Sequence, residues 1–401
     1  MILLRGTLAH SPLQEALHDH LAQWGLRLFS SDQAYARWQR QELSPDELSA
    51  LHQHVERKRH GSSADETAFY DLTASPRILP VLYSQRYEYY VAIGRIVEAH
   101  LGEAMTILDF GCGPGILTTF YARRLPHAEV TGIDRSAACI AQAQRKADEL
   151  GLKNVRFVCA DLVEGPAIGT YERVVATHAL VQSERDPGLP SISWRTFERT
   201  RDAQAQAAFE DRTGLGRRLD RVAAALVPTG RLVVFEKTRQ LSRRIPLQRA
   251  LSVRGLKLLE PPRPIRYSLV EEVSDDGPLF VLALGEEPAY VWTEDPEPDE
   301  GLPFDRVGLT SRTSGPEAPL YENHWPSAQR EWEQLHDRKV IKEASAEESD
   351  GRQLHVELGT AEGYRYLYCA NTFDQRQLVI VEPGQAAMLH TYYQEIIQGS
   401  A

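Results

Sequence analysis

The sequence has few cysteines and no long apolar segment. Its four cysteines, among 401 residues, are scattered and form neither a disulfide framework nor a metal-ligand spacing, which is typical of a protein from the reducing cytoplasm. No apolar run approaches the length of a membrane span, and the opening segment Met1–Arg5 is too short for a signal peptide. We therefore expect a cytoplasmic protein without a membrane partner. No carboxylate–histidine set has the spacing of a divalent-metal site, so no metal is expected.

The sequence also has fewer positively than negatively charged residues. The formal net charge is −11, which disfavours an extended phosphate-binding surface and therefore nucleic acid as a partner. One local exception is a group of arginines and lysines between residues 239 and 266. Because this segment contains no aromatic residue, we interpret it as a solvated helix face, with an acidic peptide, a phosphate or RNA as the alternative ligand.

The most informative segment is residues 107–115, Ile-Leu-Asp-Phe-Gly-Cys-Gly-Pro-Gly. Its aliphatic start predicts a buried strand, its glycines leave the backbone open to a ligand, and residues 116–120 begin a helical pattern. A ligand with a charged, polar tail is expected at the start of that helix. Counted from Gly111, the sixth position is Ile116 rather than glycine, so the spacing disfavours an NAD or FAD site.

Two further acids follow at the ends of predicted strands. Residues 128–134 predict a strand that ends at Asp134, about 20 residues past the glycines, the distance expected for a carboxylate that binds both ribose hydroxyls. Residues 154–162 predict a third strand, which ends in Asp161 and Leu162. A single acid at a strand end is usually a turn or cap carboxylate. Three in succession favour a ligand site.

In this combination the chain resembles the class I S-adenosylmethionine-dependent methyltransferases. The resemblance covers about residues 83–287 and implies an α/β fold with a Rossmann-like seven-stranded sheet, closed by an antiparallel hairpin that we expect over residues 264–284. It implies that Asp109 holds the amino group of the cofactor, Asp134 its ribose and Asp161 its adenine amino group. The residues expected to bind S-adenosylmethionine are Asp109, Gly111, Cys112, Gly113, Gly115, Asp134, Arg135, Asp161, Leu162 and Thr177.

The expected chemistry needs few catalytic groups. A sulfonium methyl group is already activated, so the enzyme mainly aligns the acceptor, the methyl carbon and the sulfur. His178, just past the fourth predicted strand, is the candidate general base, since histidine has an intrinsic pKa of about 6.5; packing is its alternative role. The candidate substrate contacts are Tyr87 and Tyr90, predicted on one side of a helix, and Trp194.

The acceptor is only partly defined by the sequence. Residues 176–180, Ala-Thr-His-Ala-Leu, lack the Asn/Asp-Pro-Pro-aromatic loop that methyltransferases of nucleobase or glutamine amino groups commonly carry. We therefore expect methyl transfer to an O, N or S atom of a small molecule, such as an intermediate of natural-product biosynthesis. A peptide or protein side-chain methyltransferase and a non-catalytic cofactor-binding scaffold are the alternatives.

Composition indicates several parts along the chain. With 42% hydrophobic and 25% charged residues, the chain has room for two or three domains. In the C-terminal part, residues 328–342 predict a helix, followed by three strands and a final helix. This module is expected to form a homodimer, to hold a peptide or carrier substrate, or to brace the core. The expected parts are a helical N-terminal cap (1–82), a methyltransferase core (83–287) with a lid insertion (179–216), an acidic proline-rich linker (288–325) and a small α+β module (326–401).

Overall fold

The computed structural model describes residues 11–161, 163–165, 167–181, 186–285, 290–299, 301–304, 319–347 and 351–399. The chain divides into two compact units. Unit 1 consists of Met1–Asp186, Glu210–Arg239 and Leu247–Trp292, and unit 2 consists of Pro187–Phe209, Gln240–Pro246 and Thr293–Ala401. Much of the predicted linker, including residues 305–318, lies outside the described residues. None of the described helices is long and apolar enough to cross a membrane.

Unit 1 begins with a series of six helices, the first four of which start at serine N-caps. These helices are α1 (Pro12–Gln23), α2 (Asp32–Glu42), α3 (Pro45–His60), α4 (Ser63–Thr73), α5 (Ile78–Ser84) and α6 (Tyr87–Leu101). In each of the first four, the serine before the helix accepts a hydrogen bond from a backbone N–H of the first turn. At α3 the side chain of Glu47 accepts in return from Ser44 N at 2.8 Å. The sequence pattern of a capping box therefore has its expected structure here.

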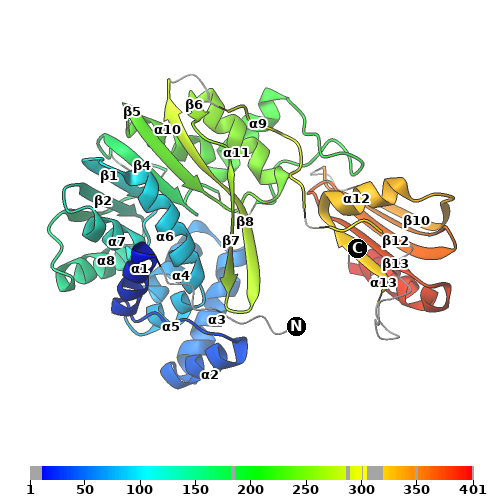
Figure 1. The fold of residues 1–401 in the computed structure, drawn as a ribbon, viewed down its shortest axis with the longest axis horizontal. Helices are drawn as coiled ribbons and strands as arrows, with labels where there is room; N and C mark the ends of the chain where they lie inside the picture. Colours follow the sequence, from blue (N-terminus) through cyan, green and yellow to red (C-terminus); the bar gives the residue numbers. More distant parts are fainter. Residues whose placement is uncertain are drawn as a thin grey trace. The chain divides into compact units, whose positions relative to one another are not determined.

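The sheet of unit 1 has the strand order β3-β2-β1-β4-β5-β8-β6, with β7 paired to β8 (Figure 1). Strands β1 to β5 are parallel, and β8 runs antiparallel to β5, β6 and β7. This arrangement confirms the predicted Rossmann-like sheet with an antiparallel closing hairpin. The strands are β1 (Thr106–Phe110), β2 (Glu129–Asp134), β3 (Val155–Cys159), β4 (Tyr171–Thr177), β5 (Leu226–Phe235), β6 (Leu256–Leu258), β7 (Arg263–Leu269) and β8 (Glu272–Leu284).

The turn of the hairpin formed by β7 and β8 lies earlier in the chain than the residues with turn composition. Residues 274–277, Ser-Asp-Asp-Gly, have turn composition but lie inside β8, where a register shift leaves Asp276 without a paired residue in β7. Gly277 has φ +117°, and a Cβ atom there would lie 2.7 Å from the backbone N of Arg239. The glycine is therefore required by the close approach of a neighbouring segment rather than by a turn.

Helices pack on the sheet to form the core of unit 1. The apolar side chains of α1, α6 and α7 (Ile116–Arg124) join those of β1 and β5 in one buried cluster that includes Leu17, Ile93 and Phe120. Helix α7 is buried from Ile116 to Ala122, so its sequence shows little amphipathic pattern. The remaining helices of this part of the chain are α8 (Ala137–Glu149), α9 (Ala203–Thr213), α10 (Leu215–Ala224) and α11 (Leu241–Val253).

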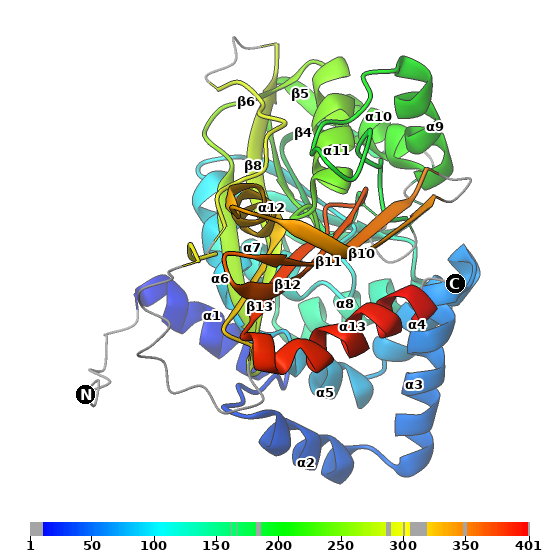
Figure 2. The ribbon, with the colours of Figure 1, turned by 90° about the vertical axis from the view of Figure 1, so that its right-hand side faces the viewer.

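Unit 2 contains an antiparallel sheet of order β10-β11-β12-β13-β9. One face packs on α12 (Trp325–Gln334) and the other on α13 (Ala386–Gly399), which follows a short 3-10 turn, η2 (Pro383–Gln385), as Figure 2 shows. The strands are β9 (Tyr321–His324), β10 (Lys339–Glu347), β11 (Gln353–Ala361), β12 (Tyr364–Asn371) and β13 (Arg376–Val381).

The prediction of a helix over residues 328–342 was wrong in its second half. Helix α12 ends at Gln334, and residues 339–347 form the edge strand β10, paired with β11. Nearly all of β10 is exposed to solvent and several of its residues are charged. An exposed edge strand carries no strong alternation of apolar and polar residues, because one face is not buried. Antiparallel pairing with β11, the next strand along the chain, determines its structure.

Candidate functional site

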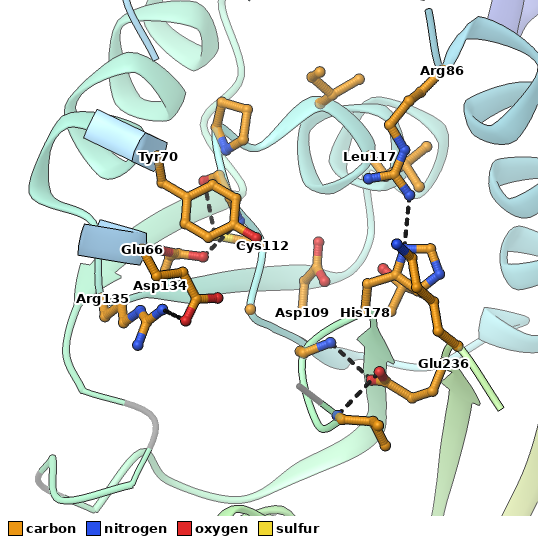
Figure 3. Close-up of a pocket in the computed structure, with 18 of the residues that line it drawn as sticks. Glu66, Tyr70, Arg86, Asp109, Cys112, Leu117, Asp134, Arg135, His178 and Glu236 are labelled. Carbon is orange, nitrogen blue, oxygen red and sulfur yellow. Dashed lines mark hydrogen bonds and ion pairs between the residues drawn. The ribbon is translucent and has the colours of Figure 1, made fainter. Parts of the chain in front are cut away.

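A cavity of unit 1 lies at the carboxyl ends of β1, β2 and β4, where open parallel sheets bind their ligands (Figure 3). One end gathers Tyr70, Glu66, Arg135 and Asp134, and the other gathers Arg86, His178 and Glu236, with Asp109 between them. The predicted site residues that line this cavity are Tyr90, Asp109, Gly111, Cys112, Gly113, Asp134, Arg135, Asp161, Thr177 and His178.

The glycine turn after β1 uses its three glycines in different ways. All three have positive φ, +82° at Gly111, +52° at Gly113 and +82° at Gly115. A Cβ atom on Gly113 would meet nothing within 4 Å, so the backbone there is open toward the cavity. A Cβ atom on Gly115 would lie 2.7 Å from Ala143 Cβ. Gly115 therefore serves helix packing at the start of α7 and is not part of the cavity wall.

Asp109 ends its strand as a buried carboxylate. It is 4% exposed and accepts a hydrogen bond from the Thr118 hydroxyl at 2.6 Å. The pKa of Asp109 is raised to about 6, because burial and, to a smaller extent, the negative charge of Asp134 outweigh the opposing bond from Thr118. A cationic amino group bound beside Asp109 would stabilise its ionised form and relieve this strain.

Asp134, at the end of β2, holds the glycine turn in place. Its Oδ2 accepts from Gly113 N and its Oδ1 from Ser136 N, both at 2.9 Å. Burial raises the pKa of the Asp134 carboxyl, while these backbone bonds lower it in part. Each carboxylate oxygen has a further lone pair. Two such acceptors, side by side, suit a vicinal diol.

Asp161, after β3, is fixed by its own turn. Its Oδ1 accepts from Val163 N at 2.7 Å and from Glu164 N at 2.8 Å. Burial alone would raise the pKa of Asp161, but these two backbone bonds outweigh it and the pKa is lowered. The carboxylate is therefore charged and keeps Oδ2 available as an acceptor. Leu162, the other predicted residue of this segment, lies outside the described residues.

Helices α3 and α4 complete the wall beside Asp134. Arg135 forms an ion pair with Glu66 at 2.5 Å, and the Ser136 hydroxyl donates to Asp71 at 2.6 Å. Lys58, Glu66 and Tyr70 all line the cavity. Sequence reasoning missed these residues, because they lie more than sixty positions before the motif they contact.

His178 lies in a strained position just past β4. It has φ +54°, a conformation that costs a non-glycine residue of order 1 kcal/mol and that concentrates at functional sites. Its Nδ1 is 2.8 Å from Arg86 Nη2, and its Nε2 is 3.1 Å from Asp276 Oδ2. The second contact is within ion-pair distance but lacks hydrogen-bond geometry. Because a guanidinium only donates, the Arg86 contact assigns the lone pair to Nδ1 and the proton to Nε2.

The surroundings of His178 keep its ring neutral. Its pKa is lowered to about 4, because burial and the nearby Arg86 and Lys237 cations outweigh the opposing effect of Asp276. The ring of Tyr89 stacks on the imidazole, with the ring centroids 5.2 Å apart. At neutral pH the imidazole is therefore uncharged, and the lone pair that a base would use is engaged by Arg86.

We expect His178 to show no titration between about pH 5 and pH 9 in the free protein, since its pKa lies near 4. Proton and nitrogen NMR of the imidazole groups, with the signal assigned by its loss in His178→Gln, measures this directly. A His178 signal that titrates between pH 6 and 7, around the intrinsic pKa of about 6.5, would contradict the buried arrangement.

Glu236, at the end of β5, binds three consecutive backbone amides. Its Oε1 accepts from Ala179 N and Leu180 N at 2.8 Å, and its Oε2 accepts from Val181 N at 3.2 Å. The side chain is almost fully buried, and burial raises its pKa to about 7 despite these bonds. Glu236 therefore fixes the loop that follows β4 and sets the position of His178.

Two predicted substrate contacts lie elsewhere. Tyr87 faces α1, where its hydroxyl is 2.8 Å from His18 Nδ1. Trp194 belongs to unit 2, where it stacks on His355 with ring centroids 3.7 Å apart. Neither lines the cavity, whereas Arg86 and Tyr89, which the sequence reasoning missed, do. The available signal was their position before the first strand, where Tyr89 directly precedes Tyr90 and Arg86 lies about one helical turn earlier.

Within the described residues, no group of three or more histidine, cysteine, aspartate and glutamate side chains is arranged to hold a metal ion. The charged groups that line the cavity are carboxylates, arginines and the two lysines Lys58 and Lys237.

Comparison with known proteins agrees with this geometry. Residues 107–192 match the sequence model of a family described as "Methyltransferase domain". A probable (S)-tetrahydroprotoberberine N-methyltransferase 2 from Papaver bracteatum is 32% identical over 78 residues, which are 20% of this chain and 22% of that protein. A tRNA (guanine-N(7)-)-methyltransferase from Rubrobacter xylanophilus is 41% identical over 82 residues, 20% of this chain and 35% of that protein. The matches thus span about a quarter to a third of the relatives' length.

Among the solved structures that the chain matches is the N-methyltransferase NodS of Bradyrhizobium japonicum WM9 in complex with S-adenosyl-L-homocysteine. It is 16% identical, with a TM-score of 0.32 over 48% of this chain and 87% of that chain.

The side chains at the cavity suit the cofactor of this family. Asp109 offers a buried carboxylate for an ammonium group, Asp134 two acceptors for a ribose diol, and Asp161 an acceptor for an adenine amino group. The open backbone at Gly113 leaves room for the methionine part. Over residues 107–192 the chain is therefore similar to the methyltransferase domain family, and the side chains at the cavity suit S-adenosylmethionine as the cofactor.

Proposed function

We propose that the protein transfers the methyl group of S-adenosylmethionine to an O, N or S atom of a small-molecule acceptor. The observation that carries this proposal is the continuity of the cavity. It runs from the acids suited to the cofactor to a second group of polar side chains, Arg86, His178 and Lys237, that the cofactor assignments leave unused. The printed names of several relatives, including trans-aconitate 2-methyltransferase and the N-methyltransferase from Papaver bracteatum, refer to small-molecule acceptors.

The proposed reaction is a direct displacement. A lone pair of the acceptor attacks the methyl carbon, the carbon–sulfur bond breaks, and the sulfur keeps the bonding electron pair. The cofactor supplies the activated methyl group when it is bound. The contribution of the chain is to hold the acceptor in line, to exclude water and to receive the acceptor's proton.

We propose His178 as the residue that receives this proton, through Nδ1. The position supports the proposal, because His178 lines the cavity immediately past β4 and its Nε2 faces Asp276, which would stabilise the imidazolium. Arg86 occupies Nδ1 in the free protein, so the arginine must move away before the proton is transferred. Glu236 is a poorer base, since its oxygens bind three backbone amides.

We also propose roles for the other parts of the chain. Residues 1–82 act as a cap, which the ties of Glu66 and Asp71 to the segment after β2 support. Unit 2, which contains residues 326–401, is a separate compact body whose role is to present or select the acceptor. In the rival interpretation, the protein binds the cofactor without transferring its methyl group.

Calorimetry with S-adenosylmethionine and S-adenosylhomocysteine, followed by transfer of a radiolabelled methyl group into extracts of the native host, tests this proposal. We expect binding of both compounds and label in a small organic compound. The His178→Gln variant should bind the cofactor normally but transfer at least about 100-fold more slowly, as expected for loss of a general base. Binding without any transfer would favour the scaffold, label in a protein would favour the peptide alternative, and absence of binding would contradict both.

A further inference from the structure

Arg86 is a cation in the wall of the cavity with an unusual partner. Its guanidinium donates to the neutral imidazole of His178 at 2.8 Å and lies over the ring of Tyr89, 4.4 Å from its centroid (Figure 3). Among the described residues, no carboxylate lies within ion-pair distance of Arg86. The residue precedes α6 and is only half-buried, because part of it faces the cavity.

Other acceptors match a guanidinium better than the neutral imidazole of His178 does. It has five N–H donors in a planar fork, which a carboxylate can accept in pairs, whereas an imidazole nitrogen accepts one. A carboxylate also carries a negative charge, which attracts the guanidinium more strongly than the lone pair of a neutral imidazole does. An anion that enters the cavity would therefore compete successfully with Nδ1 of His178 for Arg86.

The charges around Arg86 and His178 restrict the kind of anion. Arg86 directly precedes helix α6, which contributes the phenols of Tyr89 and Tyr90, and the segment after β5 adds Lys237 beside Glu236. The hairpin adds Asp276, which accepts from the Tyr267 hydroxyl and faces His178. Two cations disfavour an acceptor with a quaternary or protonated amine near Arg86. The two carboxylates disfavour a dianion such as a phosphate monoester.

We propose that Arg86 binds a carboxylate of the acceptor, and that this pairing turns Arg86 away from His178 and uncovers Nδ1 as the base. The inference rests on the proposed function and names its substrate class, an acceptor that carries a carboxylate as well as the atom to be methylated. Recognition of the acceptor and release of the base are then one event.

The proton balance of the reaction follows from this arrangement. The acceptor atom loses its proton to Nδ1 as it gains the methyl group, and the sulfur of the cofactor keeps the electron pair of the broken bond. The resulting imidazolium lies between Asp276 and the carboxylate that now occupies Arg86. Both neighbours stabilise the positive charge, which the free protein disfavours through burial.

The test uses the full-length protein saturated with S-adenosylhomocysteine and two matched pairs of probes, benzoate with benzamide and acetate with acetamide. We expect each acid to bind at least about tenfold more tightly than its amide. Arg86→Met should abolish this preference and Arg86→Lys should keep part of it. Equal binding of acid and amide, or no binding of either acid, would overturn the inference.

A second arm excludes the cofactor's own carboxylate as the partner of Arg86. S-Adenosylmethionine and its decarboxylated form are compared on the wild type and Arg86→Met, which also shows whether the variant folds. We expect the ratio of the two affinities to stay within about threefold between the two proteins. If the ratio of the two affinities falls toward one in the variant, Arg86 binds the carboxylate of the cofactor and the inference is overturned. If neither compound binds the wild type, the proposed function itself fails.

The movement of Arg86 away from His178 can be measured separately through the pKa of His178. In NMR spectra of the complex with S-adenosylhomocysteine, addition of benzoate should move the pKa of His178 upward, toward neutrality, because the arginine charge leaves the ring. Benzamide serves as the matched control and should leave the pKa unchanged. A His178 signal that is indifferent to bound benzoate would show that Arg86 does not cover the base.

Discussion

Asp134→Ala is expected to weaken the binding of S-adenosylmethionine by about 100-fold or more. The substitution removes the two acceptors proposed for the ribose diol, and hydrogen bonds to a charged group contribute about 1.5–3 kcal/mol each. It also frees the N–H groups of Gly113 and Ser136, which Asp134 holds at 2.9 Å. The glycine turn then loses its fixed position as well as its ligand contact. Titration calorimetry with S-adenosylhomocysteine measures the change without interference from turnover.

Two further variants test whether the loss of affinity comes from the carboxylate of Asp134. Asp134→Asn keeps one carbonyl oxygen and nearly the same shape, so we expect an intermediate loss. Asp148→Ala removes an exposed acid of α8 that bonds only to Gln144 among the described residues, and should leave the affinity unchanged. If Asp134→Ala bound the cofactor as tightly as Asp148→Ala does, the assignment of the ribose to β2 would be wrong.

Glu236→Ala is expected to destabilise unit 1 by about 3–5 kcal/mol, the range for removing one partner from a buried charged interaction. The N–H groups of Ala179, Leu180 and Val181 would lose their acceptor inside the protein. For a domain of this size the melting temperature should fall by about 10 °C. Scanning calorimetry identifies the transition of unit 1 as the one that S-adenosylhomocysteine raises in the wild type.

The control for this variant is Glu272→Ala, at the exposed start of β8, which should change the free energy of unfolding by less than about 0.5 kcal/mol. The pH dependence gives an independent check. The pKa of Glu236 is raised in the folded state to about 7, so its protonated form is favoured by folding. Its contribution to stability is therefore complete below the unfolded pKa of about 4.5 and is lost as the pH rises toward 7.

His178 has the opposite linkage. Its folded pKa, near 4, lies below its unfolded value, so its contribution to stability grows as the pH rises from about 4 to about 6.5. In the wild type, the pH dependence that Glu236 gives to stability is therefore nearly cancelled by the opposite pH dependence that His178 gives. Glu236→Gln should uncover the rising contribution of His178, and the wild-type profile should be flatter than that of the variant. A pH profile that is identical in the two proteins would contradict the raised pKa of Glu236.

The cofactor end of the site was predictable because its residues lie close together in the sequence. The turn from Asp109 to Gly115 and the acids Asp134 and Asp161 follow their own strands, and parallel strands bring their carboxyl ends to one edge. The acceptor end of the site could not be predicted, because Arg86 and His178 are 92 positions apart and meet only through tertiary packing. No local pattern marks such a pair.

The basic segment illustrates a different limit. Arg254 pairs with Glu210 and Asp220, and Arg239 and Arg266 both pair with Asp275. The sequence shows the cations but not the carboxylates that meet them, which come from other helices and from the hairpin. The interpretation as a solvated surface was therefore incomplete: several of these arginines connect elements of unit 1.

The placement of α3 and α4 beside the ribose site has a consequence for the catalytic cycle. Under the proposed function, the cavity wall beside the ribose site contains Lys58, Glu66 and Tyr70, and the Arg135–Glu66 ion pair connects α4 to the segment after β2. Both partners of the pair are mostly shielded from solvent, so salt screens their attraction only weakly. We therefore expect the slowest step of turnover to be the movement of these helices that lets the product exchange, rather than the transfer of the methyl group.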